Sequence, residues 1–438
     1  MAILTRFMPG SRKPARSEAI EVAANWQRPT SLFRPAPVDY DLVTQLTYMS
    51  ALATANVGRE NLFQKTAELG YSTSGYFHRV HLVAQKLNYD YARACQLVAD
   101  ATTNEVVRSL LLRFSASLAS GEPETVFLAR ETEIQLEHYS RKYERDLESL
   151  RKWTDAYVAL MVSVTLVVVV SMVSMMIYSV GTVFVLGLAV VMIGVAALGD
   201  WIIYRTSPIE PKTHHRPERS RTQLQMFSMA KILLPTGALI GAVVGFVFSI
   251  GAGMIVAAVA IAPVGILAFM DDMQVDQQDR DGSTFLRSLG SVVGAIGTTV
   301  TEGMERMNQR SLSSLEQGVR RLHVRLRSGL RPDLCWDRFI SETGSELVDR
   351  SVGTFWDTIK LGGDPDQIGY LSSLFAMKIS LMRENRKLVS QTFMYLMLPL
   401  HAVLIGIILF VTEVMVVFAT QLNNIQTQAI TSADPTTT

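Results

Sequence analysis

The sequence predicts an all-α, polytopic membrane protein with about five transmembrane helices and two repeated cytoplasmic helical-bundle domains. Three observations lead to this prediction. Apolar residues make up 48% of the 438 residues, and many of them are gathered into long runs with almost no charge. The polar regions carry apolar residues at helical spacing and lack the alternating pattern of strands. Two of these polar regions also share short motifs at a constant spacing.

Five apolar runs are long enough to cross a bilayer as helices, because a spanning helix needs about 20 apolar residues. These runs are 156–178, 182–204, 232–249, 251–270 and 393–419. Helices of soluble proteins average roughly 11–12 residues, so five runs of this length favour a membrane protein.

Basic residues near the spans predict the orientation, because short loops rich in Lys and Arg stay in the cytoplasm. The loop 205–228 contains five such residues, whereas the turns after the first and third spans contain none. The segment 421–438 also has neither Lys nor Arg. We therefore expect a multi-pass protein of the cell (inner) membrane, with a cytoplasmic N-terminus and an extracytoplasmic C-terminus.

These assignments divide the chain into six segments. Residues 1–37 have no apolar core like that of a signal peptide, and their basic composition predicts a flexible tail that is solvated or touches lipid headgroups. The other segments are a cytoplasmic helical domain at 38–153, four transmembrane helices in two hairpins at 154–271, a second cytoplasmic helical domain at 272–392, the fifth transmembrane helix at 393–420, and a polar extracytoplasmic tail at 421–438.

The two cytoplasmic domains share motifs 242 positions apart, which predicts an internal repeat. The glycine in each shared turn suits the left-handed end of a helix, and the proline and acids after it suit the start of the next helix. The matched segments are Arg108-Ser109 with Arg350-Ser351, and Gly121-Glu122-Pro123-Glu124 with Gly363-Asp364-Pro365-Asp366.

A continuous helix is expected to join each cytoplasmic domain to the span after it. The segment 131–152 contains no proline or glycine and leads directly into the first span, and 373–387 has the same place before the fifth. The repeated unit is therefore a helical bundle followed by one span.

Two features inside the predicted spans are candidates for a specific role. Glu413 lies deep in the fifth span, where insertion of an ionisable residue costs roughly 2.5–3.5 kcal/mol. It is either functional or held by a structural hydrogen bond to the first span, for which Ser171 or Ser174 would serve. Small residues on the third span allow close contact of helices, within the chain or across a dimer, and these are Gly237, Gly241 and Gly245.

The sequence carries no motif of a catalytic or metal site. It has no GxxxxGK[ST] phosphate loop, no GxSxG elbow and no HExxH helix. Its histidine pairs lack the cysteines or acids that would complete a metal site. The net charge of +1 argues against nucleic-acid binding, and Cys95 and Cys335 are too few for a disulfide framework. We expect a protein that is not an enzyme and needs no cofactor.

Two other functional classes stay open. A transporter or channel with cytoplasmic regulatory domains is the first, although transporter repeats usually lie in the spans. An aspartic prepilin-type membrane peptidase is the second, because Asp200 and Asp271 lie at the ends of the second and fourth spans. The Gly-x-Gly-Asp segment of such peptidases is incomplete here, since Ala197 stands at its first position.

The chain resembles the type II secretion F family, the membrane platform proteins of type IV filament machines such as the archaellum, the archaeal pilus and Tad-like systems. The resemblance covers about residues 40–420 and rests first on two helical domains that each lead into a span. It also rests on the turns Ser120-Gly121-Glu122-Pro123 and Gly362-Gly363-Asp364-Pro365, and on Phe285-Leu286-Arg287-Ser288-Leu289-Gly290.

This resemblance implies a non-enzymatic platform that forms a homodimer and contacts membrane lipids. It would couple a hexameric secretion ATPase in the cytoplasm to the insertion of pilin or archaellin-like subunits into a filament. Glu413 and the glycines of the third span are candidates for contact with the pilin helix. The candidates for ATPase contact, or for pairing within a domain, are Arg108, Glu122, Glu124, Arg350, Asp364 and Asp366.

Overall fold

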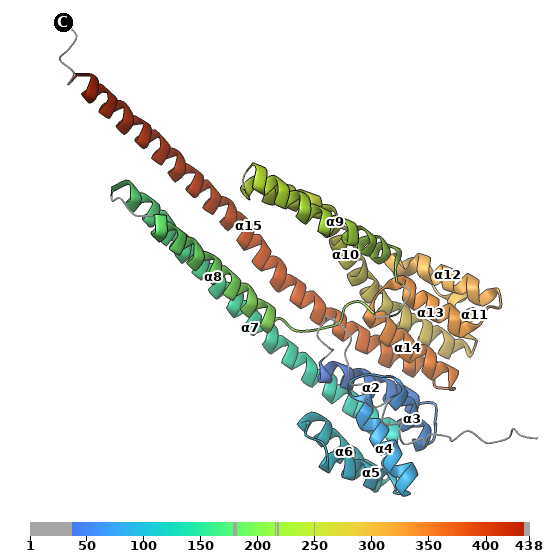
Figure 1. Ribbon diagram of the computed structural model, residues 1–438. Helices are drawn as coiled ribbons and strands as arrows, with labels where there is room; N and C mark the ends of the chain where they lie inside the picture. Colours follow the sequence, from blue (N-terminus) through green and yellow to red (C-terminus); the bar gives the residue numbers. More distant parts are fainter. Residues whose placement is uncertain (1–36, 178–181, 215, 217–218, 249, 433–438) are drawn as a thin grey trace, which may run out of the picture. The chain divides into compact units, whose positions relative to one another are not determined.

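The computed structural model describes the chain except for residues 1–36, 178–181, 215, 217–218, 249 and 433–438. The predicted basic tail therefore lies almost wholly outside the described residues. Within them every regular element is a helix (Figure 1), apart from an isolated β-bridge between Thr213 and Ser345. The prediction of an all-α fold is confirmed. The chain forms two compact units, Met1–Glu137 with Ile209–Met377 and His138–Pro208 with Lys378–Thr438.

The first unit begins with a bundle of short helices, which we call the N-terminal bundle. Its local signals are clear at α6, where the Asn104 side chain accepts hydrogen bonds from the N–H groups of Val106 and Val107 and Gly121 ends the helix at a φ of 74°. The helices are α2 (Val38–Ala53), α3 (Arg59–Glu68), α4 (Ser74–Leu87), α5 (Tyr91–Asp100) and α6 (Glu105–Ser120).

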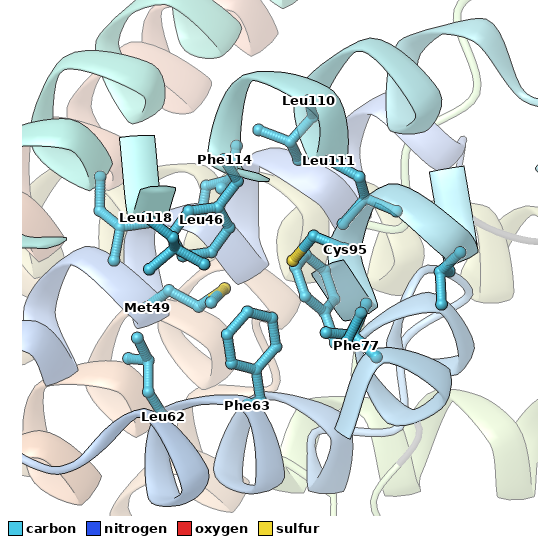
Figure 2. Packing of buried hydrophobic residues seen from close by; sticks show 14 of the residues in the cluster. Leu46, Met49, Leu62, Phe63, Phe77, Cys95, Leu110, Leu111, Phe114 and Leu118 are labelled. Carbon is cyan, nitrogen blue, oxygen red and sulfur yellow. The ribbon is translucent and has the colours of Figure 1, made fainter. Parts of the chain in front are cut away.

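The core of the N-terminal bundle is built from aromatic and aliphatic side chains (Figure 2). The ring of Phe114 lies between those of Phe63 and Phe127, with centroids 5.4 and 5.0 Å away. Leu46, which the helical spacing of α2 predicts to face inward, is fully buried beside them. Burial also raises the pKa of the Cys95 thiol to about 12, so this cysteine serves as a small apolar core residue.

A second bundle in the same unit, the C-terminal bundle, has its own core around Trp336, Phe339 and Phe355. Ala51 of α2 belongs to this core as well, so the two bundles share apolar contacts. The helices of the C-terminal bundle are the end of α10 (Ile250–Ile296), α11 (Val300–Arg306), the 3-10 helix η1 (Gln309–Leu315), α12 (Glu316–Arg327), α13 (Pro332–Thr343), α14 (Glu346–Lys360) and the start of α15 (Pro365–Ser432).

The two bundles repeat their backbone features at a nearly constant spacing. Residues with left-handed φ angles return 241 positions later, as Asn56, Asn88 and Gly121 do at Gly297, Gly329 and Gly362. Four helices of the N-terminal bundle and α7 show the same order as α11 to α15, and most start 241 positions apart. The backbone spacing is thus one residue shorter than the motif spacing of 242. The expectation of a left-handed Gly363 is wrong, because Gly362 takes that conformation with a φ of 88°.

Four helices within the described residues are long and apolar enough to cross a membrane. The apolar side chains on their surfaces support this, and Phe246 on α9 is 95% exposed. The predicted second span is helical as α8 (Thr182–Thr206), but part of its side chains lies outside the described residues. The four candidate spans are Glu124–Ser171, Thr222–Val247, Gly251–Ile296 and Pro365–Ile425.

The expected continuous helices are confirmed. α7 (Glu124–Ile177) and α15 each run unbroken from a bundle into an apolar segment. α10 does the same in the opposite order, so the predicted boundary at 271–272 does not interrupt the helix. α15 also continues to Ser432, well into the segment expected to be a polar tail.

The basic loop is shorter than the predicted 205–228. α8 ends at Thr206, and α9 (Arg221–Val247) starts early because the Ser220 hydroxyl accepts a hydrogen bond from the N–H of Gln223 at 3.2 Å. We call the remaining segment, residues 207–220, the α8–α9 linker.

Glycines bring the backbones of α9 and α10 together (Figure 1). A Cβ atom added to Gly241 would lie 2.6 Å from the Cβ of Ala257, and one added to Gly253 would lie 2.6 Å from the Cα of Gly245. A Cβ on Gly237 would likewise come within 3.1 Å of Ala260. The glycines of the third predicted span therefore face α10 within the chain.

Gly253→Ala should destabilise the hairpin, because its new methyl group would overlap the backbone of α9, at a cost of about 1–3 kcal/mol. The measurement is the thermal unfolding midpoint of the full chain in detergent. Gly265→Ala on the same helix is the control, since a Cβ there has no neighbour within 4 Å. A midpoint for Gly253→Ala equal to that of the control would contradict the packing described.

Candidate functional site

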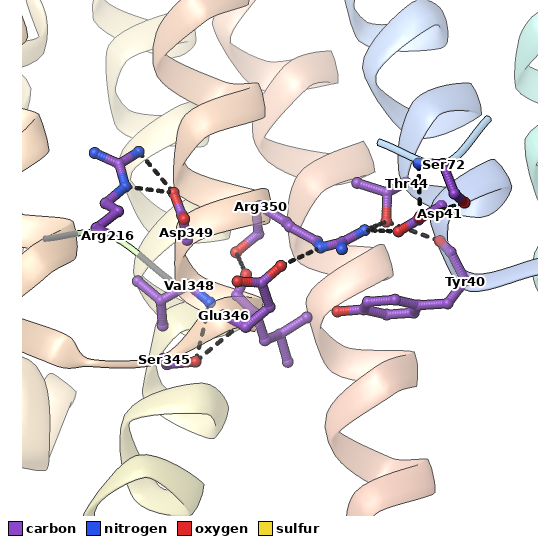
Figure 3. Close-up of polar contacts among 12 residues, drawn as sticks. Tyr40, Asp41, Thr44, Ser72, Arg216, Ser345, Glu346, Val348, Asp349 and Arg350 are labelled. Carbon is purple, nitrogen blue, oxygen red and sulfur yellow. Dashed lines mark hydrogen bonds and ion pairs between the residues drawn. The ribbon is translucent and has the colours of Figure 1, made fainter. Parts of the chain in front are cut away.

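Polar side chains from several elements meet at the start of α14 (Figure 3). The Ser345 hydroxyl accepts hydrogen bonds from the N–H groups of Leu347 and Val348 at 3.1 and 3.2 Å and so fixes the first turn. The charged residues Asp349 and Arg350 come directly after Val348. Because successive residues of an α-helix are rotated by about 100°, their side chains leave α14 in different directions.

Arg350 points toward the N-terminal bundle and is almost fully buried, with 5% of its side chain exposed. Its Nη1 atom donates to Asp41 Oδ1 at 2.8 Å and to Thr44 Oγ1 at 3.1 Å, and its Nε atom donates to Glu346 Oε1 at 2.8 Å. The guanidinium also lies over the ring of Tyr40, 4.4 Å from its centroid.

The surroundings keep this buried arginine charged. Burial opposes the charged form, but the neighbouring tyrosines and the carboxylates of Glu346 and Asp41 outweigh it, and the pKa of Arg350 lies above its usual value. Asp41 is held from its other side as well, since its Oδ2 atom accepts from the N–H of Ser72 at 3.0 Å and from the hydroxyl of Ser72 at 2.6 Å. The contact thus fixes α2, the turn before α4 and α14 relative to one another.

Asp349 points toward the α8–α9 linker instead. Arg216 of the linker donates to Asp349 Oδ1 from Nη2 at 2.7 Å and from Nε at 3.1 Å, and its Nη1 atom lies 2.7 Å from Asp337 Oδ1. Burial lowers the pKa of Arg216, but both aspartates raise it further, so the net shift is upward. Lys212 adds ion pairs to Asp272 and Asp276.

Backbone contacts complete the attachment of the linker. The N–H of His214 donates to the carbonyl of Gly344 at 3.4 Å, and the N–H of Glu346 donates to the carbonyl of Lys212 at 3.1 Å. The imidazole of His214 is buried, and burial lowers its pKa. Its Nε2 atom has no hydrogen-bond partner among the residues that the structure describes.

We call the residues Asp41, Arg216, Asp349 and Arg350 the α14 junction. It joins three parts of the first unit, namely the N-terminal bundle, the C-terminal bundle and the linker that enters this unit after α8. The described part of the chain holds no group of three or more His, Cys, Asp or Glu residues placed to bind a metal ion. The contacts of the junction are those of a mechanical connection between helices.

Two curated proteins are similar to this chain. Both are called flagella accessory protein J. The chain is 25% identical over 357 residues to the protein of Methanocaldococcus jannaschii, a match that covers 78% of this chain and 63% of that protein. It is 22% identical over 357 residues to the protein of Methanococcus voltae, with 78% and 62% covered. The chain thus spans about three fifths of the length of these relatives. No protein-family model and no solved structure matches it.

The six residues predicted for ATPase contact or pairing within a domain have different environments. Arg108 is exposed and lies 3.4 Å from Glu105, whereas Arg350 is buried in the junction and pairs with the other bundle. The backbone spacing of 241 explains this difference, because it makes Ser109 the counterpart of Arg350 and so turns Arg108 onto a different face. The prediction that Arg350 contacts a partner protein is wrong, because its side chain is buried between the two bundles.

Of the four predicted acids, Glu122 and Asp364 lie just before α7 and α15, and Glu124 and Asp366 lie in the first turns of these helices. Glu124 pairs with Arg59 at 2.6 Å, and Glu122 accepts from Arg130 at 2.9 Å. Asp364 accepts from the N–H of Asp366 at 3.1 Å, and Asp366 lies 3.8 Å from Arg287. Within the described residues no ion pair joins any two of the six, so they do not form one site. Contact with a partner stays a prediction for the five residues other than Arg350.

Of the two alternatives for Glu413, the hydrogen bond to the first span is not found among the described residues. The hydroxyls of Ser171 and Ser174 donate to the backbone carbonyls of Val167 and Val170 on their own helix, at 2.7 and 2.8 Å. Glu413 itself is exposed on α15.

Asp271, one of the two acids considered for a peptidase, is buried at the base of the α9–α10 hairpin. It accepts from the Thr222 hydroxyl at 2.6 Å and from the Gln223 amide at 3.3 Å. These bonds tie the start of α9 to α10, which is a structural role.

Sequence reasoning missed Asp41, Arg216 and Asp349 as members of one site. Each belongs to a pattern with a local explanation, since Asp41 suits the first turn of a helix, Asp349 lies in the first turn of α14, and Arg216 counts among the basic loop residues that set membrane orientation. No signal in the sequence shows that the three converge.

Arg350→Ala should lower the stability of the full chain by about 3–5 kcal/mol, because it leaves the Asp41 carboxylate buried without its partner. The measurement is the urea unfolding midpoint in detergent, followed by tryptophan fluorescence. Arg108→Ala is the control and should change stability by no more than about 0.5 kcal/mol, because Arg108 pairs only on the surface. Equal midpoints for the two variants would overturn the importance of the junction.

Acid should loosen the linker through His214. Its folded pKa lies below that of the unfolded chain, so as the pH falls below about 6.5 the unfolded state binds a proton that the folded state does not, and stability decreases. His214→Gln should therefore show a smaller drop in thermal midpoint between about pH 7 and pH 5 than the unmodified chain. At about pH 8, His214 is neutral in the folded and in the unfolded state. The difference between the two midpoints at that pH therefore measures the effect of the substitution alone and is subtracted. Identical pH profiles would refute this role.

Proposed function

We propose that this chain is a membrane component of an archaellum-type filament machine, and that it acts as the platform between a cytoplasmic secretion ATPase and pilin or archaellin-like subunits. The likeness to flagella accessory protein J over most of the chain supports the assignment to filament assembly. The division into polar bundles and apolar helices supports the platform role.

The observation that carries the proposal is the continuity of α7 and α15. α7 has 54 residues and α15 has 68, which correspond to lengths of about 80 and 100 Å. Each helix packs into a bundle core at its start, where Phe127 and Ile368 are buried, and is apolar and exposed further on. A continuous helix of this kind transmits displacement of a bundle into the bilayer without a hinge.

The α14 junction supports the same mechanism. A force applied to one bundle is shared with the other through the Arg350–Asp41 contact, and with the α8–α9 linker through the Asp349–Arg216 contact. Both bundles then move together as one body. We propose that this body receives the work of the ATPase.

An internal duplication of the type II secretion F kind is part of the proposal. Its support is the shared order of helices and the return of left-handed residues at one spacing in the two bundles. We further propose that the platform is a homodimer with no enzymatic activity or cofactor. Its bundles and N-terminus would be cytoplasmic and its C-terminus outside the cell membrane.

Lys152→Pro tests the mechanical role, because it removes a backbone hydrogen bond and kinks α7 between its bundle and its apolar segment. We expect cells that carry only this variant to make no filaments, while the protein still reaches the membrane. The measurements are filament counts by electron microscopy and the amount of protein in the membrane fraction.

Lys152→Ala is the matched control and should preserve filaments, since Lys152 is exposed and pairs only with Glu148 at 2.9 Å. Normal filaments in cells that lack the chain altogether would overturn the proposed function. Normal filaments with Lys152→Pro would overturn the mechanical role of α7 alone.

A further inference from the structure

Each bundle exposes large apolar side chains at the turn between two corresponding helices. In the C-terminal bundle, the turn between α12 and α13 exposes Val324, Leu330 and Leu334 at 56%, 55% and 59%. We call this group the α12–α13 tip. In the N-terminal bundle, the turn between α4 and α5 exposes the α4–α5 tip, which consists of Leu82, Leu87 and Tyr89 at 38%, 61% and 47%.

The two tips occupy equivalent places in the fold. The turn in each contains a left-handed residue, Asn88 in one and Gly329 in the other, and these are 241 positions apart. Helices α5 and α13 after the turns bury the same positions, as Cys95 and Trp336 illustrate. Single exposed apolar residues are ordinary, but a group that recurs at the same turn of both bundles indicates a shared contact.

Both tips lie in segments with more basic than acidic residues. Residues 318–334 contain five arginines and one aspartate, and residues 76–93 contain two arginines, one lysine and one aspartate. Three of the five arginines, Arg321, Arg325 and Arg327, pair with Glu342 or Glu305. The arginines Arg320 and Arg331 at the rim of the α12–α13 tip are exposed and make no ion pair within the described residues. An apolar centre with a cationic rim fits a surface with an apolar centre and an acidic rim.

The α12–α13 tip lies at the end of its bundle opposite the α9–α10 hairpin. The last residues of α13 are at the base of the hairpin, because the Gly344 carbonyl accepts from the Gln223 side chain at 3.4 Å. The first turn of α13 is at the other end, where Asp333 accepts from Trp356 Nε1 and Lys360 Nζ near the end of α14, both at 3.0 Å. Twelve residues of helix separate the two ends by about 18 Å.

The α4–α5 tip also points away from the α14 junction. α4 starts beside the first half of α2, where Gln45 Nε2 donates to the hydroxyl of Ser74 at 2.5 Å. Its 14 residues extend about 21 Å from there to the tip. Since the hairpin carries the apolar spans of this unit, a surface at the opposite end of the α12–α13 bundle suits a protein partner better than a lipid bilayer.

We propose that the α4–α5 tip and the α12–α13 tip form a paired docking surface for one symmetric protein oligomer, whose neighbouring subunits each present the same acidic, apolar-centred element. The two tips are equivalent binding surfaces in one chain. They therefore suit an oligomer in which neighbouring identical subunits each present the same binding surface. The greater exposure of the apolar side chains at the α12–α13 tip makes it the stronger of the two contacts. This inference rests on the proposed function, in which the partner is the hexameric ATPase.

The test uses the full chain in lipid nanodiscs and the purified secretion ATPase of the same organism as the probe, with and without ATP. Leu330→Ser with Leu334→Ser should weaken binding about tenfold or more, and Leu82→Ser with Leu87→Ser should weaken it by a smaller factor. Arg320→Glu with Arg331→Glu should also weaken binding and flatten its dependence on salt. Controls with similar exposure on other surfaces of the two bundles are Val126→Ser and Met377→Ser, which should bind normally.

The outcomes separate the two proposals. If the unmodified chain does not bind the ATPase, the proposed function and this inference both fail. If it binds but the tip variants bind equally well, only this inference fails. Loss of adsorption to anionic phosphatidylglycerol vesicles, with ATPase binding unchanged, would identify the tips as lipid contacts and would also overturn it. Unchanged circular dichroism of the variants excludes misfolding as the cause of weaker binding.

Discussion

Burial of the Arg350 guanidinium is unfavourable unless every one of its polar contacts is supplied, and the groups that supply them come from both bundles. Asp41, Thr44 and Tyr40 belong to α2, whereas Glu346 belongs to α14. A charged side chain in this position therefore stabilises one arrangement of the two bundles and penalises others, since a shifted α2 would remove the ion pair with Asp41 and leave Arg350 only Glu346 of its own helix. The apolar contacts around Ala51 hold the bundles together, and the ion pair fixes their relative position.

The residue before Arg350 extends this constraint to the α8–α9 linker. Asp349 receives Arg216 on a neighbouring face of the same helical turn, so α14 cannot move independently of either neighbour. Continuous helices then extend this connected body toward the apolar segments. In the described residues α7, α10 and α15 pass between a bundle and an apolar segment with no irregular segment in between, as the proposed transmission of force requires.

Much of this architecture follows from the sequence. The apolar runs, the helical spacing of residues such as Leu46 and Phe114, and the absence of breakers between 131 and 152 correctly predict helices and their continuity. The motif spacing is less reliable, because it aligns Gly363 with Gly121 although the backbone aligns Gly362 with it. A shift of one residue has little effect on a motif search, but it turns a helical side chain by about 100°. That is why Arg108 and Arg350 look alike in sequence and differ in burial.

The α14 junction is invisible in the sequence for a different reason. Asp41 and Arg350 are 309 positions apart, and each residue type is ordinary in its local context. The sequence also does not show that Arg320 and Arg331 are exposed and form no ion pair in the described part of the chain, since this depends on how α12 packs against α13. Only the tertiary structure decides which charges are paired.

The absence of an arginine at position 109 of the N-terminal bundle also limits how many such bundles can be stacked. A head-to-tail series would need each bundle to carry both an arginine like Arg350 and an acid like Asp41. The C-terminal bundle has such an acid, because Asp281 Oδ2 accepts from the N–H and the hydroxyl of Ser314 as Asp41 Oδ2 does from those of Ser72. At the backbone spacing the N-terminal bundle has Ser109 in place of the arginine. The series therefore ends at two bundles, because Arg350 is already paired with Asp41 and the N-terminal bundle has no arginine at the equivalent position for Asp281.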